Sequence, residues 1–145
     1  MVTLKRILIA EDDPRDVELT LEALAEHNLA NKVDVVHDGV EAMEYLRKDG
    51  KYQNRESGLP TVLLLDIKMP RMDGIEVLKE VRSDEKLKLL PVVILTSSRE
   101  APDLEAAYKL GVNAYVVKPV DFQDFIKAVK ETGVFWALLN EQPPG

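Results

Sequence analysis

Short apolar runs recur along the chain, and the segments between them are mostly polar. Such runs, bounded by turn-forming residues, predict buried strands. The run from Thr61 to Leu65 has no polar alternation, which favours a strand covered on both faces, as in a parallel sheet. The predicted strands cover residues 5–10, 32–36, 61–65, 91–95 and 112–117.

The segments between the predicted strands carry the signals of helices. Asp13 offers an N-cap, Pro14 takes the first helical position, and Asp16 places negative charge in the first turn. Residues 51–60 are polar and show no periodicity, which predicts a loop. The other predicted helices cover residues 39–49 with Gly50 as the C-terminal stop, the stretch marked by Ile75, Leu78 and Val81, residues 102–110, and a last helix capped by Asp121.

This alternation of strands and helices predicts an α/β fold with a doubly wound, parallel, five-stranded sheet. Right-handed crossovers then place helices on both faces of the sheet. A chain of 145 residues fits one domain. Hydrophobic residues make up 46% and charged residues 31%, a composition that is typical of a globular protein and not of a disordered chain.

Charge and cysteine content limit the function classes. The net charge of −7 argues against nucleic acid or an anionic membrane as a partner, because both need a positive surface. The absence of cysteine excludes a disulfide framework and a thiolate metal site. No signal-peptide pattern and no membrane-spanning run stand out, so we expect a cytoplasmic protein.

Polar residues follow the predicted strands at their carboxyl ends. Glu11 and Asp12 follow the first strand, Asp66 the third, Thr96 the fourth, and Lys118 the fifth. In an open parallel sheet, ligands bind beyond these strand ends. Taken singly, each residue has a structural explanation, such as a helix cap for an acidic residue or a solvated charge for the lysine. Their convergence on one edge favours a shared site.

The residue types at this edge suit phosphoryl transfer. Clustered carboxylates repel one another, and a hard cation such as Mg²⁺ relieves the repulsion. We expect Asp12 and Asp66 as direct ligands, Glu11 as a ligand through water, and the backbone carbonyl of Lys68 as a further oxygen. The Asp66 carboxylate is the predicted nucleophile. Lys118 and Thr96 are predicted to contact the phosphoryl oxygens.

Four ordered motifs stand out along residues 4 to about 130. They are Ile7-Leu8-Ile9-Ala10-Glu11-Asp12-Asp13, Leu64-Leu65-Asp66-Ile67-Lys68-Met69-Pro70-Arg71-Met72-Asp73-Gly74, Val93-Ile94-Leu95-Thr96-Ser97 and Val116-Val117-Lys118-Pro119. Together they resemble the motifs of the receiver domains of two-component response regulators. This resemblance implies a flavodoxin-like (βα)5 fold, Mg²⁺ at Glu11 and Asp12, aspartyl phosphate at Asp66, a cis Lys118-Pro119 bond, and a switch pair of Thr96 and Tyr115. Glu11 departs from the family, in which Asp is commoner at this position.

The polar insertion at 51–60 and the apolar ending of the chain are similar to those of single-domain response regulators that partner phytochrome-type sensor histidine kinases. The resemblance implies a receiver domain at 1–133 and a C-terminal extension at 134–145 that forms a homodimer. An apolar tail exposed to water would favour such an interface. The alternative is a tail that folds back on its own domain. The predicted interface residues are Phe135, Trp136, Leu138 and Leu139.

The resulting hypothesis is a phospho-accepting regulator that signals through altered protein contacts and is not an enzyme. A phosphatase of the haloacid dehalogenase type is one alternative, but its D-x-D pattern at the nucleophile is missing, since Lys68 stands at the second position. A receiver-like protein that only binds is another alternative. The presence of Asp66, Lys118, Thr96 and the acidic pair speaks against it.

Overall fold

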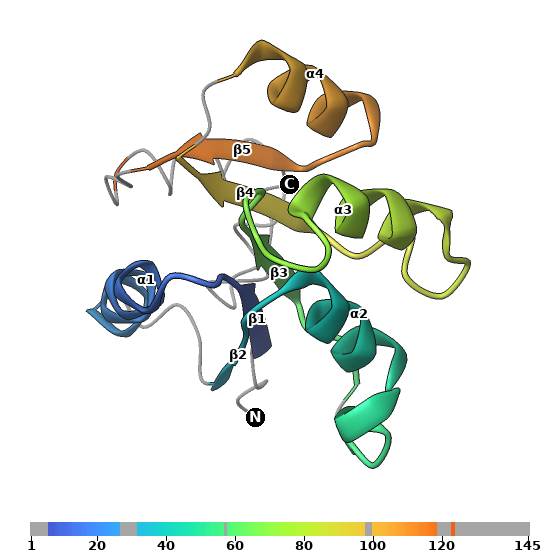
Figure 1. Cartoon of the computed structure of the whole chain (residues 1–145). Coiled ribbons are helices and arrows are strands. Elements are labelled where there is room, and N and C mark those ends of the chain that lie inside the picture. The colour runs from blue at the N-terminus through green and yellow to red at the C-terminus, as the bar shows by residue number, and fades with distance from the viewer. Residues whose placement is uncertain (1–5, 27–31, 57, 98–99, 119–122, 124–145) are drawn as a thin grey trace, which may run out of the picture.

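The computed structural model of the chain describes residues 6–26, 32–56, 58–97, 100–118 and 123. Its centre is a sheet of five parallel strands in the order β2-β1-β3-β4-β5 (Figure 1). The predicted doubly wound parallel sheet is therefore confirmed. The strands are β1 (Arg6–Ala10), β2 (Lys32–Val36), β3 (Val62–Leu65), β4 (Val92–Thr96) and β5 (Ala114–Val117).

Helices lie on both faces of this sheet. In Figure 1, α1 lies on one side of the strands, and α2 and α3 lie on the other, with α4 beside α3. The last helix predicted after Asp121, the Lys118-Pro119 bond and the residues proposed for the dimer fall outside the described residues. The helical elements are α1 (Pro14–Glu26), α2 (Gly39–Arg47), the 3₁₀ helix η1 (Gly50–Tyr52), α3 (Gly74–Ser83) and α4 (Ala101–Lys109).

The end of α2 differs from the prediction. The helix stops at Arg47, because Lys48 adopts a left-handed conformation with a φ of 59°. Gly50 also has a positive φ, of 55°, but it starts η1 and does not end α2. The predicted loop at 51–60 was therefore wrong at its start. Helix capping by a non-glycine residue at positive φ is uncommon, so the sequence favoured the glycine.

The central strand is buried on both faces, as its unbroken apolar run predicted. All four residues of β3 have exposed fractions of 1% or less. Leu63 and Leu65 belong to the core cluster that α2 and α3 cover, together with Met43 and Leu78. Val77 is fully buried in the same cluster, although the predicted apolar face of α3 did not include it.

A buried carboxylate holds the unusual α2–η1 junction together. Glu41, only 7% exposed, accepts hydrogen bonds from the His37 backbone N–H at 2.8 Å and from the Tyr52 hydroxyl at 2.7 Å. The Lys51 ammonium lies 2.7 Å from the same carboxylate. Burial alone would raise the pKa of Glu41, but these three donors outweigh it and lower that pKa to about 2.

Replacing Glu41 with Gln is expected to reduce stability at neutral pH. The folded-state pKa lies below the ordinary value, so the ionised carboxylate stabilises the fold above about pH 4.5, and this contribution is lost as the pH falls toward about 2. We expect Glu41→Gln to lower the free energy of unfolding at pH 7 by roughly 2 kcal/mol, a figure discounted for the exposed lysine.

Urea unfolding at pH 7 and at pH 3 tests this expectation. The wild type should lose more stability than Glu41→Gln between the two pH values. Glu105→Gln, which removes the same charge from an exposed position of α4, should follow the wild type. Equal losses in the wild type and Glu41→Gln would contradict the assignment.

Candidate functional site

Backbone hydrogen bonds extend the strand pairing beyond the strand ends and bring the predicted site residues together. The Glu11 N–H donates to the Val36 carbonyl and the Asp66 N–H to the Ala10 carbonyl, both at 3.0 Å. The Lys118 N–H donates to the Thr96 carbonyl at 2.8 Å. Because β1, β3, β4 and β5 are successive neighbours, these side chains share one edge of the sheet.

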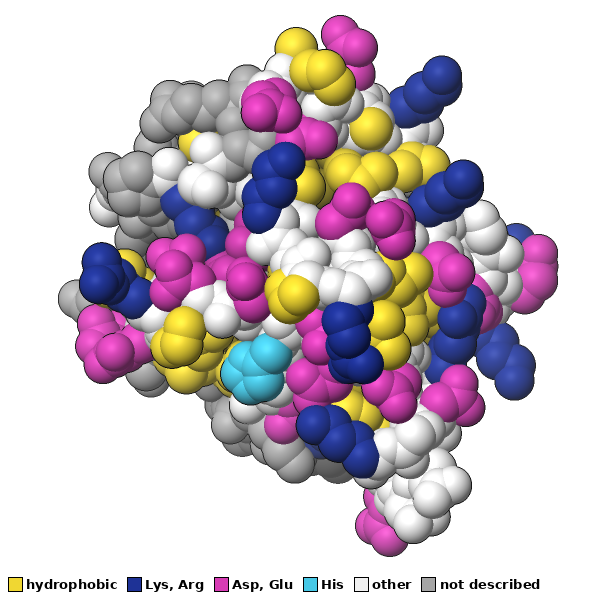
Figure 2. Space-filling view, in the orientation of Figure 1, with side chains coloured by type: hydrophobic (Ala, Val, Ile, Leu, Met, Phe, Trp, Pro, Cys, Tyr) yellow, Lys and Arg dark blue, Asp and Glu magenta, His cyan; other side chains and the backbone are white. Residues whose placement is uncertain are grey.

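Three carboxyl groups form the centre of this edge. Oxygen atoms of Glu11, Asp12 and Asp66 lie within 4.8 Å of one another. Glu11 and Asp66 are buried, with exposed fractions of 4% and 8%, whereas Asp12 is open to solvent. Acidic side chains gather between α1 and the ends of the central strands in Figure 2. This is a set of hard oxygen ligands that a divalent cation can approach from the Asp12 side.

The surroundings of Glu11 raise its pKa to about 7. Burial is the largest cause, and the neighbouring Asp66 carboxyl adds to the rise, while Lys118 opposes it. A carboxyl group with such a pKa ionises more readily when further positive charge is close. A divalent cation bound beside Glu11 would therefore favour its ionised form.

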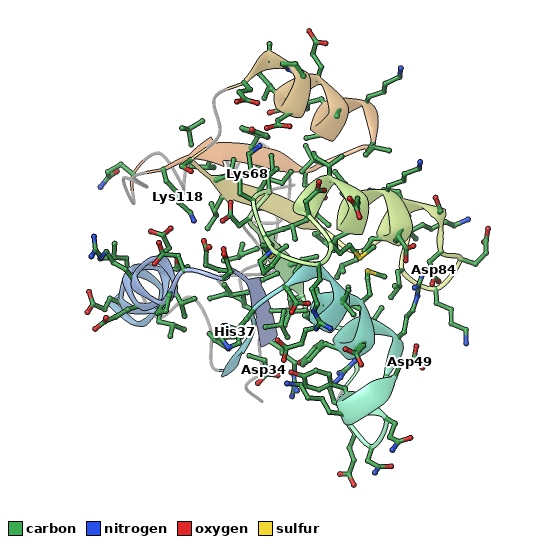
Figure 3. The ribbon with its side chains drawn as sticks, viewed as in Figure 1. Asp34, His37, Asp49, Lys68, Asp84 and Lys118 are labelled. Carbon is green, nitrogen blue, oxygen red and sulfur yellow. The ribbon has the colours of Figure 1, made fainter. Side chains whose placement is uncertain are left out.

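Lys118 is the basic residue at this site. Its ammonium forms an ion pair with Glu11 and lies 3.0 Å from Asp16 Oδ2 and 3.7 Å from Asp66 Oδ2. Burial alone would lower the pKa of Lys118, but its carboxylate partners outweigh burial and raise that pKa. Figure 3 shows Lys118 between the end of β5 and α1. Its ammonium is oriented toward the cluster.

The loop after β3 fixes the Asp66 carboxylate. Asp66 Oδ1 accepts a hydrogen bond from the Ile67 backbone N–H at 2.8 Å, which leaves Oδ2 facing Lys118. The loop then turns back, since the Gly74 N–H donates to the Ile67 carbonyl at 2.8 Å. Asp73 caps α3 by accepting from the Glu76 N–H at 2.9 Å. The loop after Asp66 therefore orients this carboxylate and also starts α3.

The other residues predicted for the site lie in β4, in β5 and in the loop after Asp66. Thr96 is fully buried at the end of β4, and Tyr115 is half-buried in β5 opposite Ile94. The Lys68 side chain is exposed, and its ammonium lies 3.8 Å from Asp103 of α4. Asp13 is a helix cap, because its side chain accepts from the Arg15 N–H at 2.8 Å.

The sequence reasoning missed one member of the site. Asp16 was assigned only to the first turn of α1, yet its carboxylate contacts Lys118. A helix that starts directly after the acidic end of β1 has its first turn over the same edge of the sheet. The position of Asp16 in that first turn, shortly after Glu11 and Asp12, was the available signal.

This arrangement suits phosphoryl transfer to a carboxylate. An oriented carboxylate, a set of cation ligands and an ammonium group lie around the place where a phosphoryl group on Asp66 would sit. Reactions of this kind depend on positioning and on neutralising the charge of the phosphoryl oxygens.

Comparisons with known proteins agree with this geometry. Residues 7–130 match the family described as the response regulator receiver domain. Response regulator Rcp1 of Synechocystis sp. is 38% identical over 132 residues, which cover 91% of this chain and 88% of Rcp1. The crystal structure of its Mn²⁺-bound form has a TM-score of 0.79 at 37% identity, covering 97% of this chain and 99% of that one.

Two further solved structures are similar over nearly the whole chain. The bacteriophytochrome response regulator AtBRR has a TM-score of 0.85 at 56% identity, covering 97% of this chain and 100% of that one. The phosphorylated cyanobacterial phytochrome response regulator RcpA has a TM-score of 0.79 at 37% identity, with coverage of 99% and 100%.

Proposed function

This chain belongs to the family of response regulator receiver domains, and we propose that its Asp66 accepts a phosphoryl group from a phosphohistidine of a sensor histidine kinase. As a response regulator it is a signalling protein of a phosphorelay. The observation that carries the assignment to Asp66 is the Lys118 ammonium 3.7 Å from its carboxylate, beside two further carboxyl groups.

The proposed step transfers phosphorus from nitrogen to oxygen. A carboxylate oxygen of Asp66 attacks the phosphorus of the phosphohistidine, and the P–N bond breaks. The imidazole keeps the electron pair and takes up a proton, while Asp66 becomes an acyl phosphate. Lys118 stabilises the charge on the phosphoryl oxygens, and the buried Thr96 contributes a hydroxyl donor at the same edge. The chain itself supplies these groups, so we also propose that it accelerates its own phosphorylation and dephosphorylation.

The acidic cluster fits a divalent cation, and we propose Mg²⁺. Glu11, Asp12 and Asp66 supply hard oxygen ligands in one place, and the Lys68 carbonyl is the proposed further ligand. When bound, Mg²⁺ neutralises part of the charge on the transferring phosphoryl group. The Mn²⁺-bound form of the similar Rcp1 supports a divalent ion here.

The proposed output is a shift between two packings at the β4–β5 edge. Phosphorylation of Asp66 adds negative charge and hydrogen-bond acceptors next to the neighbouring strand, where Thr96 ends β4. The Thr96 hydroxyl then moves toward the phosphoryl group, and the half-buried Tyr115 of β5 rotates into the space. The surface that these strands present to partners changes as a result.

The similar proteins narrow the proposed partner. AtBRR is described as a bacteriophytochrome response regulator and RcpA as a phytochrome response regulator, so we propose a phytochrome-type kinase as the phosphoryl donor.

No helix among the described residues is long and apolar enough to cross a membrane. The homodimer and the cytoplasmic location stay predictions from the sequence.

Phosphorylation of this protein is expected to require Mg²⁺. Incubation with radiolabelled acetyl phosphate and Mg²⁺ should label the chain, because acetyl phosphate can replace the phosphohistidine as donor. Excess EDTA should reduce the labelling rate by about a hundredfold, since the clustered carboxylates then repel the incoming phosphate. Readdition of Mg²⁺ should restore labelling, whereas K⁺ at equal ionic strength should not. Undiminished labelling in EDTA would refute the metal assignment.

A further inference from the structure

We propose that Asp16 of α1 is a positioning residue that holds the Lys118 ammonium away from Asp66 in the unphosphorylated protein and so restrains phosphorylation. This inference rests on the proposed phosphorylation of Asp66. In this inference Asp16, which belongs to helix α1, competes with Asp66 for the Lys118 ammonium.

The contacts of Lys118 show this competition. Its ammonium lies 3.0 Å from Asp16 Oδ2, which is a hydrogen bond, and 3.7 Å from Asp66 Oδ2, which is beyond one. Glu11 takes a second hydrogen bond. An ammonium group has three donors, and two of them are occupied by carboxylates other than the proposed phosphoryl acceptor.

The Asp16 carboxylate has no other structural task among the residues that the structure describes. The helix cap of α1 comes from Asp13, which accepts from the Arg15 N–H. The Thr20 hydroxyl donates to the Asp16 backbone carbonyl and leaves its carboxylate free for Lys118.

Phosphorylation changes the balance between the partners of Lys118. A phosphoryl group on Asp66 adds negative charge and acceptor oxygens on the Asp66 side of the ammonium. The ammonium lies 3.0 Å from Asp16 Oδ2 and 3.7 Å from Asp66 Oδ2, so moving toward these oxygens draws it away from Asp16. Asp16 also adds a negative charge that repels the incoming dianion. Both effects make the phosphorylated state less favourable than it would be without Asp16.

The affinity for beryllofluoride, a stand-in for the phosphoryl group on a carboxylate, tests this proposal. In full-length protein with Mg²⁺, titration with beryllofluoride can be followed by the NMR signal of the Ile67 amide, which donates to Asp66. Asp16→Asn should lower the half-saturating concentration by about fivefold, the size expected for one partly exposed ion pair. It should accelerate labelling by acetyl phosphate by a similar factor.

Two variants separate this role from a general charge effect. Glu18→Gln removes the same charge from an exposed position on the same helix, and it should change the half-saturating concentration by less than about twofold. Asp16→Glu keeps a carboxylate, so its half-saturating concentration should be close to that of the wild type. A merely structural role for Asp16 would leave binding unchanged or weaken it, because a destabilised helix gives no reason for tighter binding.

The outcomes are distinguishable. Equal effects of Asp16→Asn and Glu18→Gln, or weaker binding in Asp16→Asn, would overturn the inference while the proposed function stands. If the wild type does not bind beryllofluoride saturably, or if Asp66→Asn still binds it, the proposed function and the inference are both overturned.

Discussion

Replacing Asp66 with Asn is expected to reduce phosphoryl labelling of this protein to below ~1% of the wild-type level. An amide oxygen is a far weaker nucleophile than a carboxylate, and the acyl phosphate cannot form on it. The loss would not reflect unfolding. Asn removes one negative charge from a cluster in which three carboxyl groups lie within 4.8 Å, so the melting temperature should stay the same or rise.

Labelling by acetyl phosphate, followed by electrophoresis under conditions that preserve acyl phosphates, measures this loss. The matched control is Asp49→Asn, an Asp-to-Asn change at an exposed residue before η1 whose side chain makes no capping hydrogen bond. Its labelling should equal that of the wild type. Asp66→Asn that labels as fully as the control would move the phosphoryl acceptor to another residue and refute the assignment.

Gly74→Ala is expected to destabilise the fold and to disturb the site together. An added Cβ at Gly74 would lie 2.2 Å from the Asp66 carbonyl oxygen, so the backbone of either the site loop or α3 must move. In most helices this substitution stabilises, because alanine loses less conformational entropy. Here the clash should dominate, with a loss of about 2–3 kcal/mol and a melting temperature lower by roughly 10 °C.

The control for this steric argument is Gly58→Ala. Gly58 has no neighbouring atom within 4 Å of an added Cβ, so its substitution should shift the melting temperature by less than about 2 °C. Differential scanning calorimetry measures both variants, and acetyl phosphate labelling below their melting temperatures reports on Asp66. Equal melting temperatures of the two variants would show that α3 and the site loop are not as closely packed as described.

Local sequence signals located most of the fold. β2 has the predicted bounds, 32–36, and the start of α1 at Pro14 follows from a capping Asp13 and a proline at the first helical position. The junction after α2 was not predictable in this way. Its geometry depends on the buried Glu41, whose donors Lys51 and Tyr52 come from the next segment, and the sequence does not show which distant groups will meet a side chain.

The site residues also divide into those that the sequence predicted and those that it did not. Glu11, Asp66, Thr96 and Lys118 were predictable because each follows a strand, and parallel strands bring their carboxyl ends to one edge. Asp16 was not, since its role depends on how the first turn of α1 is placed over that edge, next to the Lys118 ammonium.

By itself, the sequence determined which elements form and which residue types stand at the carboxyl edge of the sheet, since apolar periodicity and capping act between near neighbours along the chain. Only the tertiary structure decided how the charges at that edge are shared. It directs the ammonium of Lys118 to Glu11 and Asp16 and leaves it 3.7 Å from Asp66. The physical reason is that electrostatic energy depends on distances between groups far apart in sequence and on their burial, which are properties of the packed molecule.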